Sequence, residues 1–184
     1  MGREPPQFAE GSRLLEEAYR FACQAHEGHR SEGDTGIDHP ARVAELLADR
    51  GFDADVLAAA LLHDTVEDTG VELDEVECRF GSRVGELVGA MTEDESFEPY
   101  ERRKAEHRAR VAAAGRAVSA IYAADKVAKL HEARENADEL PPAKLAHYAA
   151  TLRELRAAYP DLPFLDQLER ELPSAQERAV APPR

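Results

Sequence analysis

The 184-residue chain has little cysteine, little positive charge and no long apolar run, and each shortage excludes a class of protein. Its two cysteines, Cys23 and Cys78, do not make a disulfide framework. Lys and Arg number 23 against 37 Asp and Glu, so the formal net charge is −14. Nucleic-acid binding needs a basic surface, so no nucleic-acid partner is expected. No apolar run approaches membrane-spanning length and the first residues lack an apolar core, so we expect a cytoplasmic protein without membrane contact.

The residue pattern is helical throughout. Strand-like alternation is hard to find, whereas amphipathic stretches punctuated by Gly or Pro recur, which predicts a compact all-α fold. The expected helices are Ser12–Glu27, Pro40–Arg50, Ala54–Thr65, Leu73–Phe80, Ser82–Met91, Tyr100–Ala114, Arg116–Glu135, Pro142–Tyr159 and Pro163–Glu171. Nothing repeats or splits the chain, so one domain over residues 10–172 is predicted, with flexible termini at residues 1–9 and 173–184.

The segment 63–70 is the most informative one, because it carries four ligand-type side chains directly after a long apolar run. They are His63, Asp64, Glu67 and Asp68, which pair at helical spacing as 63 with 67 and 64 with 68 on one helical surface. The run before them is apolar all round and is predicted to be buried in a core. Buried carboxylates need a partner, so the motif predicts a site for a divalent transition metal such as Mn, Fe or Zn. The alternative is an exposed acidic helix end.

Two further candidate ligands stand at unusual positions. His39 precedes Pro40, and because proline is accepted at the first helical position, His39 is predicted at the helix cap. Asp125 interrupts an apolar helix and shares a face with Ile121, so it is predicted to point inward. The alternative for Asp125 is a buried acid paired with Lys129 one turn on or with a helix cap.

In order and spacing, these residues resemble the HD-domain hydrolases of the RelA/SpoT type, most closely the small stand-alone alarmone hydrolases. The likeness runs from about Ala18 to about Leu130 and includes Ala25–Arg30, Leu73–Val76, Phe80–Gly81, Met91–Thr92 and Glu101–Lys104. It implies an all-α HD-domain fold and a metal-dependent phosphohydrolase.

The resemblance also assigns roles to the candidate residues. In that family a single manganese ion is held by the residues matching His39, His63, Asp64 and Asp125. The residues matching Glu67 and Asp68 act on the attacking water. The resemblance implies removal of the 3′-pyrophosphate from ppGpp or pppGpp, so a small phosphorylated nucleotide is the expected partner.

The sequence departs from the family pattern at positions that the family uses to recognise its substrate. The family usually has a basic residue after the arginine matching Arg30 and a Pro-Tyr-Ile segment before the His-Pro, whereas this chain has Ser31 and Thr35–Asp38. Four residues after Asp125 the family has asparagine, and this chain has Lys129. These changes suit a second hypothesis, an HD phosphohydrolase for another phosphorylated nucleotide such as NADPH. A third hypothesis is a non-catalytic nucleotide-binding sensor, which would have no use for a water-activating pair.

An anionic nucleotide needs local cations in this acidic chain. Besides the metal, the substrate-binding candidates are Arg30, Lys126 and Lys129, and Arg102–Lys104 is a further source. That cluster is also explained as a solvated helix face with i,i+4 pairs to neighbouring glutamates. Lys126 follows Asp125 directly and is predicted to point about 100° away from it around the helix. The other histidines expected at surface or packing positions are His26, His107, His131 and His147.

Overall fold

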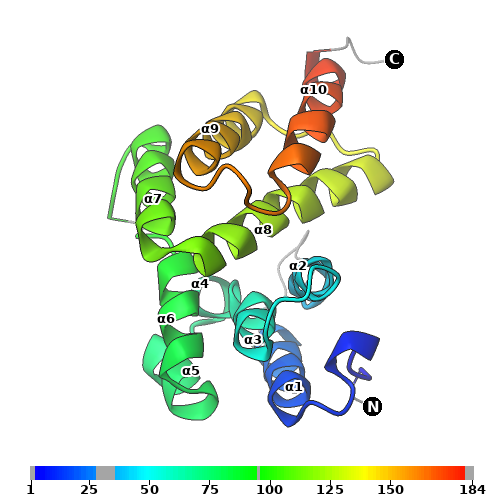
Figure 1. Ribbon diagram of the computed structural model, residues 1–184, viewed down its shortest axis with the longest axis vertical. Helices are drawn as coiled ribbons and strands as arrows, with labels where there is room; N and C mark the ends of the chain where they lie inside the picture. Colours follow the sequence, from blue (N-terminus) through cyan, green and yellow to red (C-terminus); the bar gives the residue numbers. More distant parts are fainter. Residues whose placement is uncertain (1–2, 28–35, 95, 181–184) are drawn as a thin grey trace. The chain divides into compact units, whose positions relative to one another are not determined.

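Every regular element in the described part of the chain is helical, which confirms the predicted all-α class. The computed structural model describes residues 3–27, 36–94 and 96–180. Residues 1–93 and residues 94–184 form two compact units, each with its own set of helices (Figure 1). The single domain over residues 10–172 stays a prediction. Among the described helices, none is both long enough and apolar enough to cross a bilayer.

The first unit is built around the helix that carries the apolar run. Its elements are η1 (Gln7–Ala9), α1 (Arg13–Glu27), α2 (Asp38–Ala48), α3 (Ala54–Leu62), α4 (Thr65–Thr69), α5 (Leu73–Phe80) and α6 (Ser82–Met91). Asp53 caps α3, where its side chain accepts the Val56 N–H at 3.1 Å. Residues 56–62 are all buried, and α3 contacts α1, α2 and α6 (Figure 1). The predicted core position of this run is confirmed.

Helices α5 and α6 lie in close contact, and α6 leads to Glu93. A Cβ added at Gly85 would lie 2.8 Å from the Cβ of Glu77, so only glycine lets the two helices approach this far. At the end of α6 the Thr92 hydroxyl donates to the Val88 carbonyl at 3.0 Å. Glu93 follows directly, and its backbone N–H takes part in the site described below.

The second unit is organised around α8 (Arg116–Glu135), which contacts α7 (Tyr100–Ala114), α9 (Pro142–Ala158) and α10 (Leu165–Val180) (Figure 1). Residues 118–128 of α8 are all buried. Most of them are apolar, as a helix inside a core requires. The buried polar members of this stretch are Ser119, Asp125 and Lys126.

Helix α10 extends farther than the sequence indicates. The predicted helix ends at Glu171, but the observed one continues through Pro173 to Val180. Proline in a helix interior costs about 3 kcal/mol because it removes one hydrogen bond and crowds the preceding turn. Here Leu172 and Ala175 are buried on either side of it, so packing outweighs that cost. The predicted end of the helix at Glu171 is therefore wrong, whereas the flexibility of the segment after it stays a prediction.

Candidate metal centre

The central motif lies at a junction between two helices rather than on one helical surface, which corrects the prediction. Helix α3 ends at Leu62, His63 is its C-cap, and Asp64 is the N-cap of α4. His63 Nδ1 lies 2.8 Å from the Ala60 carbonyl oxygen. In an unbroken α-helix this carbonyl would accept the N–H of Asp64, so the imidazole takes over the acceptor that continuation would use.

The same hydrogen bond prepares His63 as a ligand. A carbonyl oxygen only accepts, so Nδ1 carries a proton, and in the neutral ring Nε2 then keeps its lone pair for a metal. This Nε2 lies 3.0 Å from Oδ1 of Asp64. Two donor atoms each roughly 2.1 Å from one ion, and at right angles, are about 3.0 Å apart. The junction therefore presents a neutral imidazole nitrogen and a carboxylate oxygen at a spacing that suits a shared divalent ion.

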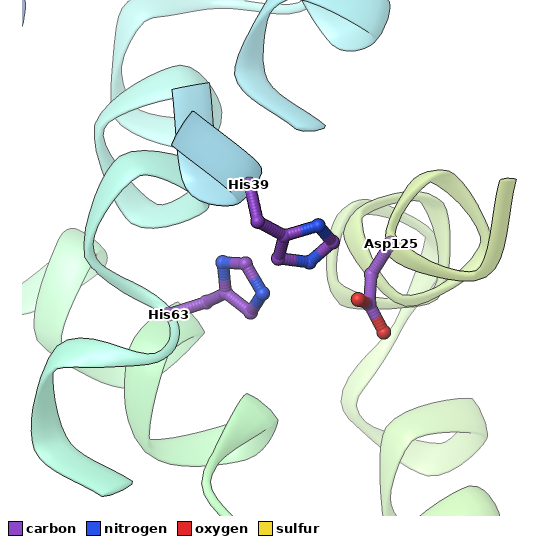
Figure 2. Close-up of side chains that lie close together, drawn as sticks. All are labelled: His39, His63 and Asp125. Carbon is purple, nitrogen blue, oxygen red and sulfur yellow. The ribbon is translucent and has the colours of Figure 1, made fainter. Parts of the chain in front are cut away.

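His39 belongs to the same unit and lies next to His63. Helix α2 begins at Asp38 with Ile37 as N-cap, so His39 is inside the first turn and not at the predicted cap. Pro40 is accepted there because the first helical N–H groups have no intrahelical partner. The His39 and His63 rings meet nearly edge to face, with centroids 5.6 Å apart, and one nitrogen of each lies within 4.8 Å of the other (Figure 2). Their roles as ligands stay predictions.

Asp125 lies in the second unit, on α8, where it is 8% exposed. Figure 2 draws it together with the α8 ribbon. Its Oδ2 forms an ion pair with Nζ of Lys126, so Lys126 does not point away as predicted. The flexible four-carbon stem lets the ammonium fold back toward the neighbouring residue. Lys129, the alternative partner, lies instead 3.9 Å from Glu132.

Glu67 and Asp68, the predicted water-activating pair, both lie on the short helix α4. One oxygen of Glu67 accepts the backbone N–H of Glu93. Glu67 is partly accessible, yet the surrounding protein removes enough of its hydration to raise its pKa to about 7; the charges of Asp64 and Glu93 act in the same direction, and the Glu93 hydrogen bond opposes it. A carboxylate with this pKa can accept a proton near neutral pH. The Asp68 N–H donates to the Asp64 carbonyl at 2.9 Å.

The predicted substrate-binding residues are less completely placed. Arg30 and Ser31 lie outside the described residues. The Lys129 side chain is 29% exposed beside Glu132. Burial lowers the pKa of Lys144 on α9, and the positive charges of Lys129, Lys126 and Lys104 add to this effect. These four lysines of the second unit therefore lie close enough for their charges to interact. The sequence did not indicate Lys144, because it stands on a separate helix with no motif around it.

The cluster Arg102–Lys104 on α7 contacts two aromatic rings and Glu98. The Arg102 guanidinium carbon lies 5.4 Å from the centre of the Phe97 ring, and Lys104 Nζ lies 5.4 Å from that of Tyr100. Arg103 Nη1 lies 3.3 Å from Oε1 of Glu98. Cation–π contacts and a pair across the helix start thus engage this cluster, and its i,i+4 pairing stays a prediction.

Comparison with known proteins gives sequence relatives. Residues 18–152 match the family described as HD domain, a range that contains all of the predicted metal-binding and water-activating residues. Guanosine-3′,5′-bis(diphosphate) 3′-pyrophosphohydrolase MESH1 of Homo sapiens is 45% identical over 101 residues, which is 52% of this chain and 56% of that protein. The Aquifex aeolicus protein named guanosine-3′,5′-bis(diphosphate) 3′-pyrophosphohydrolase is 46% identical over 88 residues, 47% of this chain and 12% of that protein. The aligned part is thus about half of the first relative and a small part of the second.

Two solved structures are similar in fold. A metazoan ortholog of SpoT, described as hydrolysing ppGpp with a role in starvation responses, aligns with a TM-score of 0.72 and 26% identity, covering 92% of this chain and 98% of that one. The lmo0812 protein of Listeria monocytogenes EGD-e aligns with a TM-score of 0.67 and 26% identity, covering 76% of this chain and 99% of that one. Both likenesses extend over most of the helices described above.

Proposed function

Since this chain belongs to the HD-domain family, we propose that it is a metal-dependent phosphohydrolase that removes pyrophosphate from the 3′ position of ppGpp or pppGpp. One observation supports the proposal most directly. His63 has its Nδ1 engaged by a backbone carbonyl, and its Nε2 lies 3.0 Å from a carboxylate oxygen of Asp64. Relatives that share this sequence region are named for that reaction. We also propose the cytoplasmic location expected from the sequence.

The donor set fits a divalent cation, and we propose Mn²⁺. His39, His63, Asp64 and Asp125 would hold it, as two neutral imidazoles and two carboxylates suit manganese, iron or zinc. Such an ion supplies Lewis acidity, by lowering the pKa of a coordinated water and by neutralising charge on a phosphate group. The backbone bond of His63 supports this assignment, because a ligand histidine normally donates its other ring N–H to a fixed acceptor.

Glu67 is the proposed proton acceptor. Its raised pKa, about 7, matches the task of taking a proton from water at neutral pH. The Glu93 N–H holds one carboxylate oxygen, which orients the group before substrate arrives. Asp68, one residue on, is proposed to orient the attacking water. This pair also argues against a sensor without turnover.

The lysines favour a substrate with several phosphates. Lys126 and Lys129, together with Arg30, are proposed to bind the phosphate groups. Lys104 lies close enough to lower the pKa values of Lys144 and His147, which marks a locally positive region in a chain of net charge −14. A second candidate, hydrolysis of another phosphorylated nucleotide such as NADPH, is favoured by Lys129 where the family has a neutral amide.

A substrate panel tests the proposal. Protein supplemented with Mn²⁺ is incubated with ppGpp, pppGpp, NADPH and common nucleotides, and phosphate is distinguished from pyrophosphate by phosphorus NMR. We expect pyrophosphate from ppGpp and pppGpp, with chelation abolishing the signal. Release of phosphate from NADPH alone would favour the second candidate. Failure to hydrolyse any of these compounds with Mn²⁺ present would contradict the proposed function.

A further inference from the structure

A buried polar network spans three helices of the second unit. Helix α7 contributes Arg108, α8 contributes Tyr122 and Lys126, and α9 contributes His147 and Glu154. Arg108 is 9% exposed, Lys126 8%, His147 6% and Tyr122 1%. Buried arginine and lysine are rare unless they are paired, because an isolated buried charge is costly. These side chains are therefore held in place by their mutual contacts.

The order of donors and acceptors fixes the state of His147. Arg108 donates from Nε to Glu154 Oε2 at 3.0 Å and from Nη1 to His147 Nδ1 at 2.9 Å. Because a guanidinium has only donors, Nδ1 must accept and the ring proton must sit on Nε2. This Nε2 lies 3.2 Å from the hydroxyl oxygen of Tyr122 and donates to it. Burial, assisted by three neighbouring cations, lowers the pKa of His147 to about 3, so the ring stays neutral.

Tyr122 in turn presents its ring to Lys126. The ammonium nitrogen of Lys126 lies 3.8 Å from the centre of the Tyr122 ring and 5.9 Å from that of Tyr148. A cation is attracted to the negative face of an aromatic ring, and the attraction is stronger where water is excluded. The hydrogen bond from His147 holds the Tyr122 hydroxyl, and so the ring on which the ammonium rests.

The last member of the network is Asp125. Lys126 Nζ pairs with Oδ2 of this carboxylate. A carboxylate offers about four acceptor positions on two oxygens, so it can keep this pair and still bind an ion through Oδ1. The position of the Asp125 carboxylate thus depends on Lys126, which depends on Tyr122 and His147.

We infer that His147 is a positioning residue for the metal site: through Tyr122 and Lys126 it orients the carboxylate of Asp125 as a ligand. The inference rests on the proposed function for the role of Asp125. It assigns to His147 a task beyond packing, which is to relay the position of Arg108 on α7 to a ligand on α8. Outer partners of metal ligands typically change metal affinity by roughly 10–100-fold when they are removed.

Mn²⁺ affinity, measured by titration calorimetry on the full chain without substrate, is the direct test. His147→Leu removes both hydrogen bonds at similar volume, and we expect the Kd for Mn²⁺ to rise about tenfold. Tyr122→Phe keeps the ring under Lys126 and removes only the hydroxyl, so a smaller rise is expected. His147→Gln restores an acceptor for Arg108 and a donor for Tyr122, and should return the Kd toward the wild-type value.

His131→Leu is the matched control. His131 is partly buried on α8, and its Nε2 lies 3.0 Å from Glu171 and 3.1 Å from Gln167, outside the network. It should lose hydrogen bonds but leave the Kd for Mn²⁺ unchanged. Circular dichroism checks folding, and if His147→Leu does not fold, Tyr122→Phe decides. A folded His147→Leu or Tyr122→Phe protein with wild-type Mn²⁺ affinity would overturn the inference.

The outcome for the positioning role is separable from that for the proposed function. If the wild type binds Mn²⁺ but does not hydrolyse ppGpp, the function fails and the affinity series still decides the role of His147. If the wild type hydrolyses ppGpp and all folded variants bind Mn²⁺ equally, only the positioning role is wrong. If the wild type binds no divalent ion, both are wrong.

Discussion

The two units differ in how they treat the charges that they remove from water. In the first, desolvation by the surrounding protein and the charges of Asp64 and Glu93 raise the pKa of the exposed Glu67, so the negative form is disfavoured. In the second, burial would lower the pKa of Lys126, but Asp125 and two tyrosines outweigh it and raise the pKa, so the positive form is favoured. The first unit therefore gains by binding a cation, whereas the second already balances its buried lysine.

This contrast assigns different tasks to the two regions. The α3–α4 junction combines imidazoles and carboxylates, whose mutual repulsion a divalent ion would relieve. Helix α8 has a carboxylate whose cation partner comes from the same helix, with lysines beyond it that suit an anion. The predictions below change one region at a time.

Removal of Asp64 should have the largest effect. Asp64→Ala takes away a proposed ligand at the junction, so we expect metal-dependent hydrolysis to fall below detection. Mn²⁺ binding should weaken by more than the roughly 10–100-fold that is typical when an outer partner of a metal ligand is removed. Turnover and calorimetry measure the two effects. Asp49→Ala, at the exposed C-cap of α2, is the matched control and should behave as wild type. Normal turnover by Asp64→Ala would show that the junction is not the metal site.

Glu67→Gln separates proton transfer from metal binding. The amide keeps the size of the side chain but cannot accept a proton, so kcat should drop by about 10²–10⁴. Mn²⁺ affinity should stay within a few-fold, because Glu67 is not a proposed ligand. Glu86→Gln, on the exposed side of α6, serves as control. Equal losses of kcat and of metal affinity in Glu67→Gln would instead make Glu67 a ligand.

The pH profile tests the same group without a mutation. Glu67 must be ionised to act, and its pKa is raised from 4.5 to about 7, so kcat/KM should rise with pH through a midpoint near pH 7 and level off above it. A bound cation favours the carboxylate and moves this limb to lower pH. The limb should be absent from the residual activity of Glu67→Gln. An acid limb that persists unchanged in that variant would assign it to another group.

The helices could be predicted from the sequence where a single amphipathic face or a single apolar run defines them. The apolar stretch before His63 and the long run around Asp125 were both expected inside a core, and both are buried. The break between α3 and α4 could not be predicted, because it depends on the bond from the His63 ring to the Ala60 carbonyl. The end of α10 was missed because Pro173 is normally a stop signal, and here packing outweighs it.

The candidate site shows a similar division. The proximity of His39 and His63 could be expected, because both belong to motifs whose order in the sequence resembles that of a known family. The partner of Asp125 could not be predicted. Helical geometry separates neighbouring residues by about 100°, and the flexible Lys126 side chain nevertheless reaches back to the Asp125 carboxylate. The network through His147 joins three helices, so no local pattern in the sequence could indicate it.

Lys129→Asn should have the smallest effect and probes the second region alone. The lysine lies 3.9 Å from Glu132, and an i,i+3 pair of this kind contributes about 0.2–0.5 kcal/mol to stability. If its charge also binds a substrate phosphate, the change should weaken ppGpp binding by about 1 kcal/mol, roughly fivefold in KM, with kcat unchanged. The loss should be greater for substrates with more phosphates.

A second readout comes from Lys144, whose pKa is lowered by burial and then by Lys129. Removal of that neighbouring charge should raise the pKa of Lys144, which NMR of labelled lysine side chains can follow. Lys129→Arg keeps the charge and should leave KM and the Lys144 pKa unchanged. A higher Lys144 pKa with an unaltered KM would show that the charge of Lys129 acts on Lys144 but does not contribute to substrate binding. In that case the departure at Lys129 would reflect its pair with Glu132 alone.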